Sequence, residues 1–188
     1  MIVINSPQNK LTLDEFLKLP PSKPILEYIN GEISSKPMPK GRHSRLQIKL
    51  STLINDVSEN NKIAYAFPEL RCTFGDRSIV PDISVFRWQN IIFNNQGEIE
   101  DNFSLPPDWS IEILSPEQKS NKVIGNILHC LNYGCQLGWL IDADDYSILV
   151  FLEGKQPQIL YQNDRLPVLE CIDLKLTVND IFSLLKMN

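Results

Sequence analysis

The sequence predicts one α/β domain in which helices flank a mixed sheet, with a core in the order helix, three strands, helix, strand. Apolar residues recur at helical spacing in two long segments, and short apolar runs lie between and after them. The length of 188 residues suffices for one domain with a substantial core. The expected core spans about residues 25–145, and strands and a helix over residues 146–188 extend it.

The N-terminal elements follow from local signals. Thr12 can cap a short helix over residues 13–19, which the following prolines end. Residues 25–29 and 32–34 surround Asn30-Gly31, a pair typical of the type I′ turn of a β-hairpin. A loop over residues 36–41 then leads into a long helix. Its expected buried positions are Leu46, Leu50, Leu53, Ile54 and Val57.

The middle of the chain reads as strands, with one insertion. We expect strands at residues 63–67, 70–74, 79–86 and 109–114. Residues 88–107 are rich in Asn and Pro, which favours a loop or mobile insertion.

A second helix and a group of C-terminal elements complete the fold. Ser115-Pro116-Glu117-Gln118 combines a capping serine, a first-turn proline and a capping-box glutamine, so a helix is expected to begin at Pro116. Gly134 is its expected end. Its expected core stripe is Ile124, Ile127, Leu128 and Leu131. Residues 137–141 predict a strand, residues 146–152 and 158–161 an edge pair, and Thr177 can cap a last helix over residues 178–185.

Composition excludes several classes of protein. No apolar run reaches the ~20 residues that span a bilayer, and residues 1–5 show no secretory signal, so we expect a cytoplasmic protein without a membrane partner. The net charge of -5 argues against non-specific polyanion binding by the whole surface. Cys130 and Cys135 are five residues apart and would not share a helix face, so buried reduced thiols are expected rather than zinc ligands.

Two carboxylates occupy stretches that otherwise read as buried strands. Asp82 lies in Val80-Pro81-Asp82-Ile83-Ser84-Val85, and Glu112 in Trp109-Ser110-Ile111-Glu112-Ile113-Leu114. At a separation of about 4 Å the two charges would repel by about 4 kcal/mol, at an effective dielectric constant of about 20. A shared proton, a basic side chain or a divalent cation would have to offset this repulsion. The alternative is two unrelated strand residues that face solvent.

The same stretches, in this order, resemble the PD-(D/E)XK nuclease superfamily. More narrowly, the chain is similar to a restriction-endonuclease-like family known as a domain of unknown function. The resemblance covers most of residues 10–150 and is specific only when its parts are taken together. The matching stretches are Glu27-Tyr28-Ile29-Asn30-Gly31-Glu32, the helix of His43, Val80-Pro81-Asp82-Ile83-Ser84-Val85, Ile111-Glu112-Ile113-Leu114-Ser115-Pro116 and Gly138-Trp139-Leu140-Ile141-Asp142.

The resemblance implies a restriction-endonuclease-like core and a Mg²⁺-dependent endonuclease that hydrolyses DNA, with Mn²⁺ as a possible substitute. Asp82, Glu112 and the backbone carbonyl of Ile113 would be the metal ligands, all of them hard oxygen donors. The metal would activate water and stabilise charge on the attacked phosphate. Nuclease folds of this kind often pair, so a homodimer is also possible.

The chain departs from the superfamily pattern at the lysine that orients the attacking water. That lysine normally stands two residues after the second acid, where this chain has Leu114. In the narrower family a basic residue on the next helix is thought to replace it, and that position is Asn126 here. We take Lys122 as the catalytic candidate, with Lys119 as the alternative. Both would be solvated if the helix began at Pro116.

A basic group precedes these elements and suggests contact with nucleic acid. It comprises Lys36, Lys40, Arg42, Arg45 and Lys49, with no acid among them. Arg42, Arg45 and Lys49 recur at helical spacing, which suits phosphate contacts, although a solvated helix face is the alternative. His43 lies on the core-facing side of that helix and can approach the acids, as a structural histidine or a substrate-binding one.

Two further acidic features are expected to be structural. Glu27 alternates with apolar neighbours, so we expect it to face solvent, with a supporting role behind the metal ligands as the alternative. Asp142, Asp144 and Asp145 read as a turn between strands.

Three functions therefore compete. The first is a Mg²⁺-dependent DNA endonuclease. The second is a nuclease-derived module that binds nucleic acid or protein without cutting, which the missing lysine and the net negative charge favour. The third is an oligomeric interaction protein with no role on nucleic acid.

Overall fold

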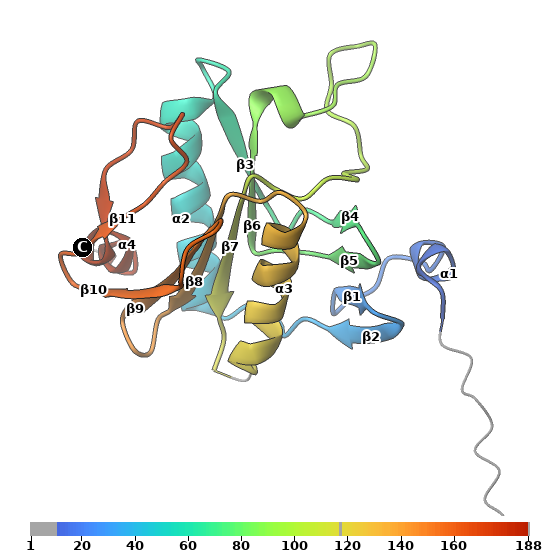
Figure 1. The fold of residues 1–188 in the computed structure, drawn as a ribbon, viewed down its shortest axis with the longest axis horizontal. Helices are drawn as coiled ribbons and strands as arrows, with labels where there is room; N and C mark the ends of the chain where they lie inside the picture. The colour runs from blue at the N-terminus through green and yellow to red at the C-terminus, as the bar shows by residue number, and fades with distance from the viewer. Residues whose placement is uncertain (1–10, 117, 188) are drawn as a thin grey trace, which may run out of the picture.

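A mixed sheet of six strands forms the centre of the protein (Figure 1), which we describe from a computed structural model over residues 11–116 and 118–187. The strand order is β10-β9-β8-β7-β6-β3, in which β7 and β8 are parallel and every other neighbouring pair is antiparallel. The strands are β3 (Ala64–Pro68), β6 (Ile83–Arg87), β7 (Trp109–Leu114), β8 (Leu137–Asp142), β9 (Ser147–Leu152) and β10 (Gln158–Tyr161).

Helices cover both faces of this sheet. Helix α2 (Gly41–Ser58) buries Leu46, Leu50 and Ile54 in the main hydrophobic core, together with alternate residues of β7 and β8. Helix α3 (Ser120–Asn132) covers the opposite face, where Ile127 packs against Leu140 and Phe151. This division follows the period of two along each strand. The order α2, β3, β6, β7, α3, β8 confirms the predicted α/β core.

A smaller antiparallel sheet lies beside the first, with the order β2-β1-β5-β4 (Figure 1). Its hairpin joins β1 (Leu26–Ile29) to β2 (Glu32–Ser35), and φ is 52° at Asn30 and 86° at Gly31. Two positive φ angles define the expected type I′ turn, in which Asn and Gly cost least. The other two strands are β4 (Cys72–Phe74) and β5 (Arg77–Ile79).

The prediction of one strand over residues 79–86 was wrong. Strand β5 ends in the small sheet and β6 begins in the large one, and Val80, Pro81 and Asp82 connect them. Pro81 has no N–H with which to continue a ladder. The Asp82 carbonyl instead accepts from the Gln47 side chain at 2.8 Å and from Glu69 N–H at 3.1 Å. The first acid therefore lies where the chain passes between sheets.

The predicted start of the second long helix was also wrong. Helix α3 begins at Ser120, with Lys119 as its N-cap, while Ser115 and Gln118 form a separate turn. In this turn Ser115 N–H donates to Gln118 Oε1 at 3.0 Å, and Gln118 N–H donates to Ser115 O at 2.9 Å. The capping pattern thus closes a turn before the helix. Glu117 lies outside the described residues.

The stripe of buried residues on α3 is shifted from the predicted one. Leu128 is 44% exposed, whereas Val123, Ile127 and Cys130 are buried. Val57 on α2 is likewise 36% exposed. On both helices, the buried face includes fewer of the apolar side chains than the sequence pattern predicted.

The remaining elements lie at the periphery. Helix α1 (Leu13–Leu17) and α4 (Val178–Ser183) have complete capping boxes at Thr12 and Thr177. Strands β11 (Arg165–Leu166) and β12 (Leu176–Thr177) pair, and residues 88–107 contain the short helix η1 (Trp88–Asn90). Over residues 11–116 and 118–187, no helix is long and apolar enough to cross a membrane. Residues 1–5, on which the expectation of no secretory signal rests, lie outside the described residues.

Candidate active site

The two strand carboxylates meet between the large and small sheets. The antiparallel register of β6 and β7 pairs Ile83 with Ile111, which places Asp82 beside Glu112. Asp82 is 1% exposed and Glu112 is 2% exposed. Ile113 N–H donates to Asp82 Oδ2 at 2.7 Å, so the backbone of β7 directly holds the acid that precedes β6. The alternative of two unrelated solvent-facing residues is therefore excluded.

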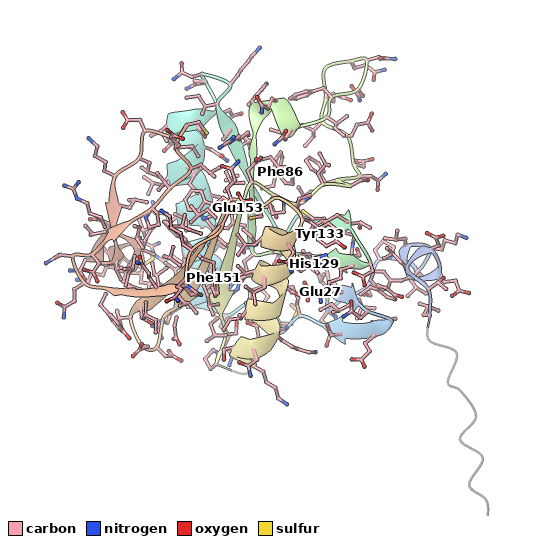
Figure 2. All side chains as sticks on the ribbon, viewed as in Figure 1. Glu27, Phe86, His129, Tyr133, Phe151 and Glu153 are labelled. Carbon is pink, nitrogen blue, oxygen red and sulfur yellow. The ribbon has the colours of Figure 1, made fainter. Side chains whose placement is uncertain are left out.

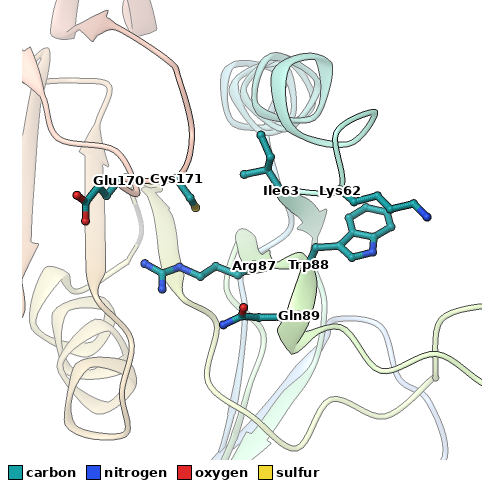
Figure 3. A pocket seen from close by; sticks show the side chains of 7 residues that line it. All are labelled: Lys62, Ile63, Arg87, Trp88, Gln89, Glu170 and Cys171. Carbon is teal, nitrogen blue, oxygen red and sulfur yellow. The ribbon is translucent and has the colours of Figure 1, made fainter.

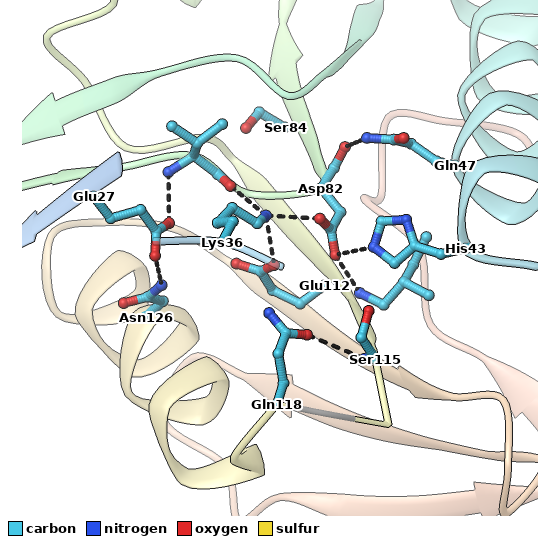
Figure 4. Close-up of polar contacts among 12 residues, drawn as sticks. Glu27, Lys36, His43, Gln47, Asp82, Ser84, Glu112, Ser115, Gln118 and Asn126 are labelled. Atoms are coloured by element: carbon cyan, nitrogen blue, oxygen red, sulfur yellow. Dashed lines mark hydrogen bonds and ion pairs between the residues drawn. The ribbon is translucent and has the colours of Figure 1, made fainter. Parts of the chain in front are cut away.

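One lysine contacts both carboxylates (Figure 4). Lys36 Nζ lies 2.7 Å from Asp82 Oδ1 and 3.6 Å from Glu112 Oε2, and it donates to Val80 O at 2.6 Å. Lys36 belongs to the loop that joins β2 to α2, and its side chain is 10% exposed. Buried charges require such partners, and this ammonium offsets part of the repulsion between the two acids.

Helix α2 supports Asp82 from the other side. His43 Nε2 lies 3.1 Å from Asp82 Oδ2, and Gln47 reaches the Asp82 backbone carbonyl. Both residues belong to the first two turns of α2, one turn apart, so they share a helix face. His43 Nδ1 is buried and lacks a hydrogen-bond partner in the described part of the chain.

The electrostatics separate the two acids. Burial disfavours ionisation of Asp82, but the Lys36 charge and the His43 hydrogen bond outweigh burial and hold the pKa of Asp82 below its ordinary value. Burial raises the pKa of Glu112 well above its ordinary value, and the charges of Asp82 and Glu27 add to this against the opposing charge of Lys36. Burial also disfavours charge on Lys36, yet attraction to Glu112, Asp82 and Glu27 raises its pKa overall. Asp82 and Lys36 are thus the charged pair, and Glu112 is the group that more readily holds a proton.

A third carboxylate, Glu27 of β1, supports the site from the small sheet. Glu27 is only 7% exposed, so the prediction that it faces solvent was wrong. Its Oε1 accepts from Val80 N–H at 2.9 Å, and its Oε2 lies 3.5 Å from Asn126 Nδ2 of α3. Figure 2 shows Glu27 beside α3. Val80 is therefore held at its N–H by Glu27 and at its carbonyl by Lys36.

Two cavities adjoin this cluster. One, of about 270 Å³, is lined by Glu112, Glu27, Lys36, Lys119, Lys122 and Asn126, among other residues. The second, of about 170 Å³, lies on the Asp82 side and includes Lys36, His43, Ser115 and Gln118. Lys36, Pro37 and Gln118 line both cavities.

The oxygen atoms of the site suit a divalent metal ion. Glu112 Oε1 is buried and accepts no hydrogen bond from the described residues, whereas both oxygens of Asp82 have partners. A buried carboxylate oxygen without a partner is costly unless a cation or proton satisfies it. Within residues 11–116 and 118–187 no three or more His, Cys, Asp and Glu side chains are grouped to hold a metal ion. Mg²⁺ commonly uses one or two carboxylates with water and substrate phosphate, so this pair fits it.

The structure does not bring the predicted arginines to the acids. Arg42 pairs with Asp144 at 2.8 Å and with the Ala143 carbonyl. Arg45 donates to Leu184 O at 2.6 Å and to Lys186 O at 2.5 Å. Both side chains thus attach α2 to C-terminal parts of the chain, and Lys49 is exposed on the same helix. A role in DNA binding for these three residues stays a prediction.

The predicted catalytic lysine lies at the mouth of the site. Lys119, the N-cap of α3, and Lys122 in its first turn are exposed and line the 270 Å³ cavity. The described contacts of Asp82 and Glu112 include an ion pair with Lys36 and none with Lys119 or Lys122.

The sequence did not place Lys36 beside the acids, and it offered the supporting role of Glu27 only as the alternative to a solvent-facing position. Lys36 follows the hairpin by one residue, and Glu27 alternates with apolar neighbours that become buried. Both residues reach the acids only because the hairpin of β1 and β2 packs against the connection between β5 and β6, so no pattern along the chain links them. Asp142, Asp144 and Asp145 form the turn between strands that the sequence predicted. The N–H groups of Asp144 and Asp145 both donate to Asp142 Oδ1.

Two other features of the described residues differ from this site. A pocket of about 660 Å³ lies near the beginning of η1 (Figure 3), and Glu170 is the one carboxylate among its lining residues. All four cysteines are free thiols: Cys72, Cys130 and Cys135 are buried, and Cys171 is exposed. Neither feature offers a pair of carboxylates.

Comparison with known proteins agrees with the resemblance seen in the sequence. The pattern of the Uma2 family, described as "Putative restriction endonuclease", matches residues 13–179. A solved structure of a putative nuclease belonging to DUF820, from Anabaena variabilis ATCC 29413, is similar with a TM-score of 0.91 and 49% identity. The match covers 93% of this chain and 99% of that one. No curated protein matches.

Proposed function

Because the chain belongs to the Uma2 family of putative restriction endonucleases, we propose that it is a metal-dependent nuclease that hydrolyses phosphodiester bonds in DNA. The observation that carries the proposal is the buried cluster of two carboxylates, Asp82 just before β6 and Glu112 on β7, with one ammonium. Lys36 Nζ lies within 3.6 Å of both Asp82 and Glu112. Buried acids that converge beside a cavity suit the charge changes of phosphoryl transfer.

The chain's own groups divide the work. Asp82 is held by Ile113 N–H, His43 and Lys36, so its carboxylate is oriented before any ligand arrives. Glu112 Oε1 is the oxygen available to a cation, and the Ile113 carbonyl is a further candidate ligand. Mg²⁺ or Mn²⁺ held by these atoms would polarise the phosphate and make water a stronger nucleophile.

The reaction is the addition of water across one ester bond. The water oxygen forms a bond to phosphorus, one P–O ester bond breaks, and the departing alkoxide takes up a proton as the water releases one to solvent. The products are a phosphomonoester and an alcohol. The enclosed carboxylates orient the reactants, which lowers the entropic part of the barrier.

Phosphate contacts outside the reacting centre come from the mouth of the cavity. Lys119 and Lys122 line this opening and are exposed. Their charges would hold the DNA backbone without reading its sequence. Because the protein as a whole is negatively charged, these two lysines favour a local contact with DNA over general polyanion binding. A homodimer with one site for each DNA strand stays a prediction that sedimentation can check.

The test compares the wild-type protein with Asp82→Asn and Glu112→Gln, which keep the shape of each side chain. Plasmid and branched DNA are incubated with Mg²⁺ or Mn²⁺, and Mn²⁺ binding is measured by calorimetry. We expect cleavage by the wild type, loss of at least a hundredfold in both variants, and weaker Mn²⁺ binding. A wild type that neither cuts these substrates nor binds Mn²⁺ contradicts the proposal.

A second function, DNA binding without cleavage, has one observation in its favour. Lys36 already neutralises part of the acid pair, so the cluster is partly compensated before a metal arrives. In that case DNA affinity survives Asp82→Asn and decreases with salt, while Mn²⁺ adds no cleavage.

A further inference from the structure

Lys36 makes three polar contacts inside the site and belongs to neither of the strands that carry the acids. Its ammonium has three N–H donors, and its contacts are Val80 O, Asp82 Oδ1 and, at 3.6 Å, Glu112 Oε2. The loop that carries Lys36 is fixed at its base by Lys36 N–H, which donates to Ile25 O at 2.8 Å. The position of Lys36 is therefore fixed by a backbone hydrogen bond as well as by the ion pairs of its side chain.

The two positions at which the family resemblance implies a lysine are occupied by other residues in this chain. Leu114, two residues after Glu112, is a half-buried apolar side chain packed in the cluster beneath α3. Asn126 is 7% exposed, lines the same cavity as Glu112, and donates toward Glu27. Because the Asn126 side chain is uncharged, the buried cation next to both acids within the described residues is Lys36.

We propose that Lys36 is the catalytic lysine of this site, supplied by the loop after the hairpin instead of by β7 or α3. Its ammonium holds Asp82 in place and, when a ligand binds, exchanges the long 3.6 Å contact with Glu112 for an oxygen of the phosphate or of the attacking water. This assignment rests on the proposed nuclease function. Lys36 lines both cavities that adjoin the acids, so a ligand in either cavity would lie beside this residue.

Lys36 acts through charge and hydrogen bonds, and it keeps its proton throughout. In hydrolysis the water oxygen bonds to phosphorus, the ester P–O bond breaks, and the protons exchange with solvent. Negative charge grows on the phosphate oxygens in the transition state, where a fixed donor lowers the barrier. Removing one such donor from an enzyme typically costs about 10²–10³ in kcat.

The experiment compares the wild type with Lys36→Met and with Lys155→Met, a control on the exposed turn between β9 and β10. We expect Lys36→Met to lower kcat by about 10²–10³, with KM changed less than threefold and Mn²⁺ binding retained. Lys155→Met should leave all three unchanged. Lys36→Gln, which keeps an N–H donor, serves as a second variant if the apolar methionine side chain prevents folding.

A double variant that supplies the ammonium from another element gives a further readout. This readout would not change if Lys36 had only a structural role. Lys36→Met combined with Asn126→Lys returns an ammonium to the same cavity from α3, and we expect kcat to recover at least tenfold over Lys36→Met. Absence of recovery counts against the proposal.

The outcomes distinguish the catalytic role of Lys36 from the proposed nuclease function. A Lys36→Met protein that folds and cuts within threefold of the wild type overturns the assignment and leaves the nuclease function standing. Loss of folding or of Mn²⁺ binding in both Lys36 variants assigns the lysine a structural role, and also overturns it. A wild type that neither cuts nor binds Mn²⁺ overturns the proposed function and this inference together.

Discussion

His43 Nε2 lies 3.1 Å from Asp82 Oδ2, so the first turn of α2 contacts the acid that lies between the two sheets. The same oxygen accepts the Ile113 N–H of β7 at 2.7 Å. Asp82 is thus oriented by one helix and one strand that are distant in sequence. Groups that orient a metal ligand typically matter almost as much as the ligand itself.

His43→Ala should therefore weaken the site without abolishing it. We expect Mn²⁺ affinity or cleavage to decrease by about 10–100-fold, the usual cost of removing a partner behind a metal ligand. Calorimetry and plasmid cleavage measure the two effects. Ser44→Ala, at the next and exposed position of α2, is the matched control. Equal Mn²⁺ affinity in both variants would show that His43 does not orient Asp82.

Glu112→Gln should stabilise the fold in a pH-dependent way. The native pKa of Glu112 is raised well above its ordinary value of 4.5, chiefly by burial, so the native state holds this proton more tightly than the unfolded chain. The wild type then loses stability as the pH rises from about 4.5 through the native pKa. Glutamine cannot ionise and avoids this loss. We expect a higher Tm for Glu112→Gln at pH 8, and little difference at pH 4.5. Thermal melts that show no pH-dependent gap would refute this expectation.

Arg45→Ala should lower stability because Arg45 attaches α2 to the C-terminal segment. Its guanidinium donates to the carbonyls of Leu184 and Lys186, and charged hydrogen bonds of this kind contribute about 1–2 kcal/mol when partly exposed. Urea unfolding should show a decrease of this size. Lys49→Ala, one turn along the same helix and exposed, should change stability by less than about 0.5 kcal/mol. Similar effects in both variants would argue against the anchoring role.

Lys119→Ala combined with Lys122→Ala should weaken DNA binding through the loss of phosphate contacts. Each phosphate contact contributes about 0.9 to the slope of log affinity against log salt, so the slope should decrease by about 2. Fluorescence anisotropy at several salt concentrations gives this slope, with Lys155→Ala as the control. An unchanged slope would mean that DNA does not contact the mouth of the cavity.

Local sequence signals predicted most of the secondary structure. The Asn30-Gly31 turn, the caps at Thr12 and Thr177, and strand β7 over Trp109–Leu114 all follow from short-range geometry. The errors occurred where distant groups compete for the backbone. Residues 79–86 divide into two strands because Gln47 and Glu69 take up the Asp82 carbonyl. No local propensity contains this information.

The sequence alone determined which two acids to examine, because a carboxylate inside an apolar strand must find a partner. It also determined the α/β core, through hydrophobic periods that differ between helix and strand. The tertiary structure decided which cation neutralises the acids. Lys36 reaches Asp82 and Glu112 because the hairpin of the small sheet folds against the crossing between the sheets, bringing together residues more than forty-five positions apart. Such contacts depend on the packing of whole elements, which spacing along the chain cannot reveal.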